Sequence, residues 1–174
     1  LFDIGIFSNL SHDHLDYHKN MKKYFESKLY LFKNLIKNQG NIISDANISQ
    51  INQIKKISLK KKIDLNLIFS KKNGIELISH EFEKEKQILK ILFKNKIFNI
   101  QLNLIGKIQV KNVLMAILAA NKSGLKFEKI INVLNKIKPV EGRLEKIGNI
   151  RNNSKVILDY AHTPEALELA LLNL

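Results

Sequence analysis

The chain contains no cysteine, and only two of its 174 residues are proline. Without cysteine, disulfide bonds and thiolate metal sites are excluded within this stretch, a composition compatible with a cytoplasmic protein. No apolar run approaches the roughly 20 residues that a membrane-spanning helix needs, and no basic-then-apolar secretory signal is present. The length suffices for one full domain with a substantial core and part of a second.

Arginine is also scarce, because only Arg143 and Arg151 occur among 29 basic residues, although the formal net charge is +13. Proteins that read bases or phosphates usually rely on the bidentate guanidinium group of arginine. Here the lysines are spread along the chain and do not cluster beside aromatic residues. We therefore interpret the charge as solvated lysine faces and expect no nucleic-acid partner. A basic nucleic-acid-binding module would instead predict steeply salt-dependent affinity.

The first two thirds of the sequence predict an α/β fold. Segments with strand character alternate with helical spacing of apolar residues, which favours a mostly parallel sheet covered by helices. The middle is β-rich, and we expect an edge sheet there with hairpins at Asn73-Gly74 and at residues 94–96. The expected elements are strands over residues 2–7, 41–44, 63–70, 75–82, 87–93 and 97–104, and helices over residues 21–35, ended by Gly40, and 48–57.

The last third predicts two helices, a connector and the start of a new α/β unit. Gly124 and Pro139 are expected to end the two helices. The chain begins at Leu1 in an apolar run and ends at Leu174 in an unfinished helix, so we expect an internal piece of a longer protein. The expected elements are helices over residues 110–123 and 127–137, strands around residues 144–147 and 155–159, and a helix with Thr163 as N-cap and Pro164 as its first residue.

The polar turn after the first strand holds three of the five histidines, namely His12, His14 and His18. Ligand sites in α/β sheets gather at the carboxyl ends of strands. A metal site and a solvated polar turn are equally compatible with this spacing. Zinc loops of metallo-β-lactamase-like hydrolases have one residue fewer before the last histidine, and magnesium prefers oxygen ligands.

Lys28 lies on the apolar stripe of the predicted helix over residues 21–35, with Tyr24, Leu31 and Phe32 as helical neighbours. A lysine there costs stability unless its amine reaches water or finds a partner. Desolvation lowers the pKa of such an amine, and a neutral amine can take up carbon dioxide as a carbamate, an oxygen ligand for magnesium. Reaching water is the usual outcome for a lone lysine.

The segment from Asp159 to Pro164 follows the last predicted strand and opens the last predicted helix. An aspartate at a strand end can bind a ribose hydroxyl or a metal, and a helix N-terminus attracts anions. Asp159 could instead cap the loop, and His162 could satisfy a backbone group.

Several segments, in this order, resemble motifs of the Mur-type amide-bond ligases. Residues 9–18 read NLSHDHLDYH and, with Ser27-Lys28, resemble the NLSRDHLDYH motif and the A-A-K helix of the MurE branch. The other matches are residues 106–120 with G-x-x-N-x-x-N-x-x-A-A-x-A, residues 140–145 with the GR-hydrophobic-E linker, and residues 158–165 with D-Y-A-H-T-P. The resemblance covers nearly the whole chain and is vaguest over residues 41–100. Two residues depart from it: His12 replaces an arginine, and Gln109 replaces the first asparagine of the helix motif.

The resemblance implies an ATP-dependent ligase that activates a carboxylate as an acyl phosphate, which an amino acid then attacks. The substrates would be UDP-N-acetylmuramoyl-L-alanyl-D-glutamate and diaminopimelate or lysine, with ATP and Mg²⁺ as cofactors, in peptidoglycan synthesis. It further implies a cytoplasmic monomer with no membrane partner. Residues 1–138 would be the C-terminal part of the central ATP-binding domain, residues 139–153 a linker, and residues 154–174 the beginning of a Rossmann-like C-terminal domain.

By the same resemblance, His14 would be a magnesium ligand, and Lys28 would be carbamylated (N6-carboxylysine) and help to hold the metal. Asn112 would contact adenine, Arg143 the phosphates and Asp159 the ribose. No G-T-x-G-K-T phosphate loop occurs in the sequence, so we expect residues 1–174 alone to be inactive. The ligases MurC, MurD and MurF and folylpolyglutamate synthetase share this lysine–histidine pattern and remain alternatives; a metal-dependent hydrolase is a remote one.

Overall fold

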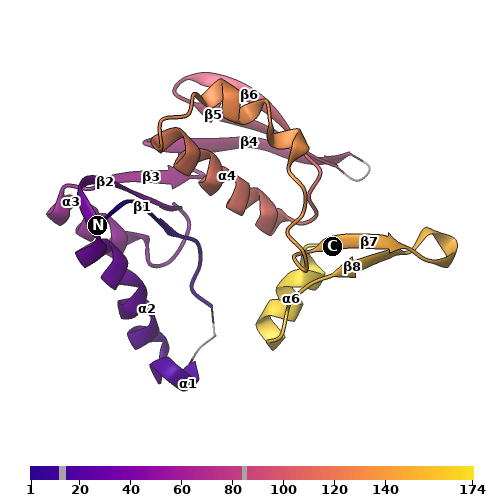
Figure 1. The fold of residues 1–174 in the computed structure, drawn as a ribbon, viewed down its shortest axis with the longest axis horizontal. Coiled ribbons are helices and arrows are strands. Elements are labelled where there is room, and N and C mark those ends of the chain that lie inside the picture. Colours follow the sequence, from indigo (N-terminus) through magenta and orange to yellow (C-terminus); the bar gives the residue numbers. More distant parts are fainter. Residues whose placement is uncertain (12–14, 84–85) are drawn as a thin grey trace.

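A six-stranded sheet forms the centre of the computed structural model, which describes residues 1–11, 15–83 and 86–174 (Figure 1). The strands lie side by side in chain order, parallel from β1 to β4 and antiparallel from β4 to β6. This arrangement confirms the predicted mostly parallel sheet with a β-rich edge. The strands are β1 (Phe2–Phe7), β2 (Ile36–Asp45), β3 (Asp64–Ile68), β4 (Gly74–Glu83), β5 (Lys86–Phe93) and β6 (Lys96–Leu102).

Helices cover both faces of the sheet. The sheet and these helices, which lie before residue 139, form a body with three layers and two cores. One core lies under α2 (Met21–Tyr30), a π-helical turn (Leu31–Leu35) and α3 (Ile51–Lys61). The other lies under α4 (Lys107–Lys122) and α5 (Phe127–Ile131), and α4 contacts β1 to β4. Apolar residues three and four apart turn one stripe of α4 inward: Val110, Val113, Leu114, Ile117 and Leu118.

The predicted role of Gly40 as a helix breaker is wrong. The helical segment ends at Leu35, and Ile36 is already extended (φ −84°, ψ 132°). Gly40 lies inside β2, where the pairing with β1 shifts and Gln39 takes a positive φ of 63°. A Cβ on Gly40 would lie 2.7 Å from the Ile36 side chain, so the irregular pairing requires glycine there.

The hairpin predicted at Asn73-Gly74 is also wrong, because β3 and β4 run parallel. Phe69 (φ 58°) and Asn73 (φ 60°) both adopt left-handed backbone in the short connection between these parallel strands. A Cβ on Gly74 would lie 1.7 Å from the carbonyl oxygen of Leu67, so the backbones approach too closely for any side chain. The hairpin at residues 94–96 is confirmed: Lys94 and Asn95 have positive φ, as a two-residue turn between antiparallel strands requires.

The C-terminal unit contains β7 (Glu145–Asn149) and β8 (Lys155–Leu158), an antiparallel pair, followed by α6 (Pro164–Leu172). A short 3-10 turn, Arg151–Asn153, joins the two strands, and the pair projects away from the central sheet (Figure 1). Thr163 caps α6 as predicted, since its side chain accepts from the Ala166 N–H. The helix predicted over residues 127–137 is shorter, consisting of α5 and a 3-10 turn, Leu134–Lys136.

α1 (Leu15–His18) is a single turn that precedes α2. None of the helices in the described part of the chain combines the length and the apolar character needed to cross a membrane.

Candidate functional site

A cavity of about 470 Å³ lies where the start of α4, the connector before β7 and α6 meet. Its walls include Asn112, Arg143 and Asp159, the three residues predicted to bind a nucleotide, together with Asn9 and Gln109. These residues are far apart in the sequence and come from four segments. The fold therefore brings all three predicted nucleotide residues to one cavity.

The α4 wall of the cavity is tied to the connector by Gln109. Its side-chain nitrogen donates to the carbonyl oxygen of Arg143 at 3.2 Å, and its oxygen accepts from Asn112 Nδ2 at 3.4 Å. Asn112 is exposed on the second turn of α4. Gln109, which replaces an asparagine of the motif, thus connects the helix that carries Asn112 with the segment that carries Arg143.

Arg143 lies over an aromatic ring. Its guanidinium carbon is 5.2 Å from the centroid of Tyr160, whose backbone N–H donates to the Gly142 carbonyl at 2.8 Å. Stacking of this kind contributes about 0.5–1 kcal/mol at an exposed site and therefore favours this orientation of the guanidinium group. The arginine is thus presented to the cavity beside the Tyr160 ring.

Both carboxylate oxygens of Asp159 accept hydrogen bonds from backbone N–H groups. One accepts from the Leu144 N–H at 2.8 Å and the other from the Ala161 N–H at 2.9 Å. The loop-capping role left open by the sequence is therefore present, and His162 likewise contacts the Tyr160 carbonyl through Nδ1 at 3.0 Å. A carboxylate offers about four lone-pair positions, so Asp159 can accept a further hydroxyl donor from the cavity.

Lys28 finds partners at the end of β1. Its amine donates to the Asn9 carbonyl at 2.9 Å and lies 4.7 Å from the centroid of the Tyr24 ring. The half-buried side chain thus turns toward the loop after β1, although it lies on the apolar side of α2. Because Asn9 also lines the cavity, Lys28 and the nucleotide candidates lie at the same edge of the sheet.

The histidine loop is described only in part, since His12, Asp13 and His14 lie outside the described residues. His18 stacks on Tyr24 with ring centroids 4.9 Å apart. In residues 1–11, 15–83 and 86–174, no three histidine or acidic side chains converge in a way that could hold a metal. The predicted roles of His14 and Lys28 in metal binding therefore stay predictions.

One buried ion pair near the site was not predicted from the sequence. Lys111 on α4 lies 2.6 Å from Asp45 at the carboxyl end of β2, and the Asp45 side chain is only 2% exposed. The same carboxylate accepts from the Asn47 N–H at 2.8 Å. The sequence shows a lysine directly before Asn112 and an aspartate at the end of an apolar strand. Neither residue indicates that the other is its partner in the fold. The pair fixes α4 against the sheet beside Asn112.

The comparison with known families and sequences gives two findings. A family model described as Mur ligase middle domain matches residues 1–120. A UDP-N-acetylmuramoyl-L-alanyl-D-glutamate–2,6-diaminopimelate ligase from Rickettsia typhi is 34% identical over 172 residues, which are 99% of this chain and 34% of that protein. The chain spans about a third of the length of the curated relatives that it matches.

Two solved structures have the same fold. MurF from Acinetobacter baumannii superposes with a TM-score of 0.83 at 18% identity, over 99% of this chain and 38% of that one. A MurF ligase from Thermotoga maritima in complex with ADP superposes with a TM-score of 0.78 at 17% identity, over 98% of this chain and 39% of that one. At this identity the likeness concerns the fold alone.

Proposed function

Because the chain belongs to the Mur ligase family, we propose that it works as part of a cytoplasmic MurE-type ligase. This enzyme uses ATP to join meso-diaminopimelate to UDP-N-acetylmuramoyl-L-alanyl-D-glutamate in peptidoglycan synthesis. The observation that carries the proposal is the cavity lined by Asn112, Arg143 and Asp159. Further support comes from the relatives named for this reaction and from the ADP held by a MurF of the same fold.

In this proposal the cavity binds the nucleotide. Asn112 offers an amide to the adenine edge, Arg143 places a positive charge for the phosphates, and Asp159 accepts from a ribose hydroxyl. These chemistries suit the three groups, because guanidinium pairs with phosphate and a carboxylate accepts from hydroxyls. The network from Asn112 through Gln109 to Arg143 holds two of the three residues in one frame.

We further propose that Lys28, as a carbamate, and His14 hold Mg²⁺, which would neutralise phosphate charge when bound. The position of the Lys28 amine beside the Asn9 carbonyl fits this role, since a carbamate there would place oxygens at the edge of the sheet that also holds the cavity. As an unmodified cation the amine would repel a metal. The carbamate is therefore essential to this part of the proposal.

The nucleotide site is tested by titrating ADP into the 174-residue chain and following backbone amide resonances. We expect millimolar binding, equivalent to about −4 kcal/mol, because the sequence has no G-T-x-G-K-T loop. Asn112→Ala should weaken binding, whereas Asn121→Ala, about 13 Å further along the same helix, should not. Resonance changes confined to residues remote from the cavity would contradict the proposal.

The carbamate is tested with carbon-13-labelled bicarbonate. A carbamate resonance should appear in the unsubstituted chain and disappear in Lys28→Arg, while Lys23→Arg on the exposed face of the same helix retains it. No ATP-dependent amide formation is expected from residues 1–174 alone, and its detection would overturn that expectation. Tight zinc in elemental analysis would favour the hydrolase alternative, and strongly salt-dependent DNA or RNA binding would favour the nucleic-acid alternative.

A further inference from the structure

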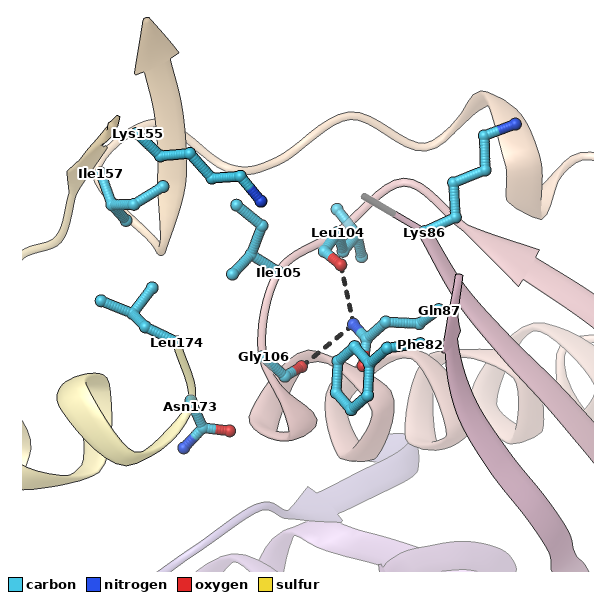
Figure 2. A pocket seen from close by; sticks show the side chains of 10 residues that line it. All are labelled: Phe82, Lys86, Gln87, Leu104, Ile105, Gly106, Lys155, Ile157, Asn173 and Leu174. Atoms are coloured by element: carbon cyan, nitrogen blue, oxygen red, sulfur yellow. Dashed lines mark hydrogen bonds between the residues drawn. The ribbon is translucent and has the colours of Figure 1, made fainter. Parts of the chain in front are cut away.

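Gln87, at the start of β5, is a buried amide whose hydrogen-bonding groups are all engaged. It is only 1% exposed. Its nitrogen donates to the carbonyl oxygens of Leu104 at 2.7 Å and Gly106 at 3.2 Å (Figure 2). Its oxygen lies 2.8 Å from His80 Nε2. Because both amide hydrogens go to carbonyls, the oxygen must accept, and His80 must carry its proton on Nε2.

The carbonyls that Gln87 holds lie directly before α4. Gly106 is the residue before the first turn, with a positive φ of 90°, and its carbonyl also accepts the Gln109 N–H at 3.1 Å. Gly106 has no side chain with which to cap or anchor the helix. The start of α4 is therefore held in place from the sheet side by the amide of Gln87.

Two residues from beyond residue 138 also lie against this turn. Asn173 Oδ1 accepts the Ile108 N–H at 3.0 Å, and the Leu144 side chain lies so close to Gly106 that a Cβ there would be 2.6 Å from it. Leu144, Ile108 and Asn173 all line the cavity proposed to bind the nucleotide, whereas Gln87 does not. Gln87 thus contacts the helix start from outside the cavity.

We propose that Gln87 is a positioning residue for the nucleotide cavity. By fixing the Leu104 and Gly106 carbonyls it sets where α4 begins, and so where Gln109 and Asn112 lie relative to Arg143 and Asp159. This inference rests on the proposed function, because it assigns Gln87 to that same site. Without the amide, the Leu104 carbonyl loses its donor and the Gly106 carbonyl keeps only the Gln109 N–H, so the segment can recover the lost hydrogen bonds only by moving toward water.

The test is Gln87→Met, which keeps the length of the side chain and removes its polar atoms. In the ADP titration we expect affinity to fall about tenfold, the effect of roughly one lost hydrogen bond. Hydrogen exchange of the Gln109 amide should be faster in the unliganded chain, because its acceptor is the Gly106 carbonyl. A smaller loss of about threefold is expected for His80→Leu, which removes only the partner of the Gln87 oxygen.

Two control variants separate positioning from general stability. Leu89→Ala opens a hole in the core from the same strand and leaves the amide in place, and Gln101→Met makes the same exchange on β6. Both should bind ADP like the unsubstituted chain once the folded fraction is taken into account. If Gln87→Met is destabilised but binds ADP normally, the positioning role is overturned. Normal binding by His80→Leu overturns it as well where Gln87→Met does not fold.

Failure of the proposed function gives a different result. In that case the unsubstituted chain does not bind ADP at all, and the positioning role falls with the site. If the unsubstituted chain binds ADP and Gln87→Met binds it equally well, only the positioning role is lost.

Discussion

The body and the C-terminal unit are held together in different ways. Each strand of the six-stranded sheet contributes side chains to at least one of the two buried cores. Beyond residue 138, Leu144 is the one apolar side chain of the described residues that is fully buried, and α6 buries none. Hydrogen bonds from Ile108 to Asn173 and from Gln109 to Arg143 also join the two regions.

This difference matters because the cavity is built from both regions. Asn112 lies on α4 of the body, whereas Arg143 and Asp159 lie beyond residue 138, where few apolar side chains are buried. Local opening is expected where few apolar contacts are buried. The two halves of the proposed nucleotide site should therefore separate without unfolding of the sheet, and substitutions in the two regions should have different signatures.

The largest effect is expected for Gly74→Ala in the body. The new Cβ would overlap the Leu67 carbonyl, which is backbone and cannot turn away. We expect a loss of about 3 kcal/mol or more in the free energy of unfolding, measured with urea. The matched exchange in the C-terminal unit is Gly148→Ala, where a Cβ meets nothing within 4 Å. That variant should be neutral or slightly stabilising. An equal loss of unfolding free energy in the two variants would contradict the difference between the body and the C-terminal unit.

Leu144→Ala should open the junction and leave the body intact. The residue is 3% exposed, and its side chain lies directly against Gly106 at the start of α4. Truncation of a buried leucine costs about 2–5 kcal/mol, and we expect the lower end because one side of the junction is weakly packed. Hydrogen exchange should accelerate in β7 and β8 but not in β2. Leu172→Ala, at a residue that is 74% exposed, serves as the control. It should change neither the free energy of unfolding nor the hydrogen exchange of β7 and β8.

Lys111→Met tests the buried ion pair of the body. Removal of the lysine leaves the Asp45 carboxylate without its partner, and breaking a buried pair costs about 3–5 kcal/mol. Because the Lys111 side chain is 34% exposed, we expect a smaller loss of about 2 kcal/mol in urea unfolding. Lys107→Met, exposed on the first turn of the same helix, should stay within about 0.5 kcal/mol. Similar values for the two variants would show that the pair contributes nothing to the body.

The features that the sequence predicted are those set by neighbouring residues. The Lys94-Asn95 hairpin follows from a short polar turn that contains Asn95, a residue type that tolerates positive φ, and the Thr163 cap follows from its side-chain oxygen. The roles of Gly40 and Gly74 were missed, because each glycine is required by a strand that lies beside it only after folding.

The same limit applies to the candidate site. Asn112, Arg143 and Asp159 were found through the motifs that they share with the Mur ligases. Asp45 and Gln87 were missed because their partners, Lys111 and Gly106, are distant in the sequence and mark no local pattern. Residues that position a site through buried contacts therefore become visible only in the folded chain.

The smallest effect is expected for the exposed pair between Asp3 on β1 and Lys37 on β2. A hydrogen bond from Lys37, and then its charge, lower the pKa of the Asp3 carboxyl below its ordinary value of 3.8. A carboxyl whose pKa is lowered on folding stabilises the protein at pH values above its ordinary pKa. This contribution is lost as the pH falls through the lowered pKa. Asp3→Asn should therefore lower the melting temperature slightly at neutral pH, less so at high salt, and not at all in strong acid. Asp64→Asn, at an exposed residue of β3, is the control. If the lower melting temperature of Asp3→Asn persists in strong acid, the ion pair is not its cause.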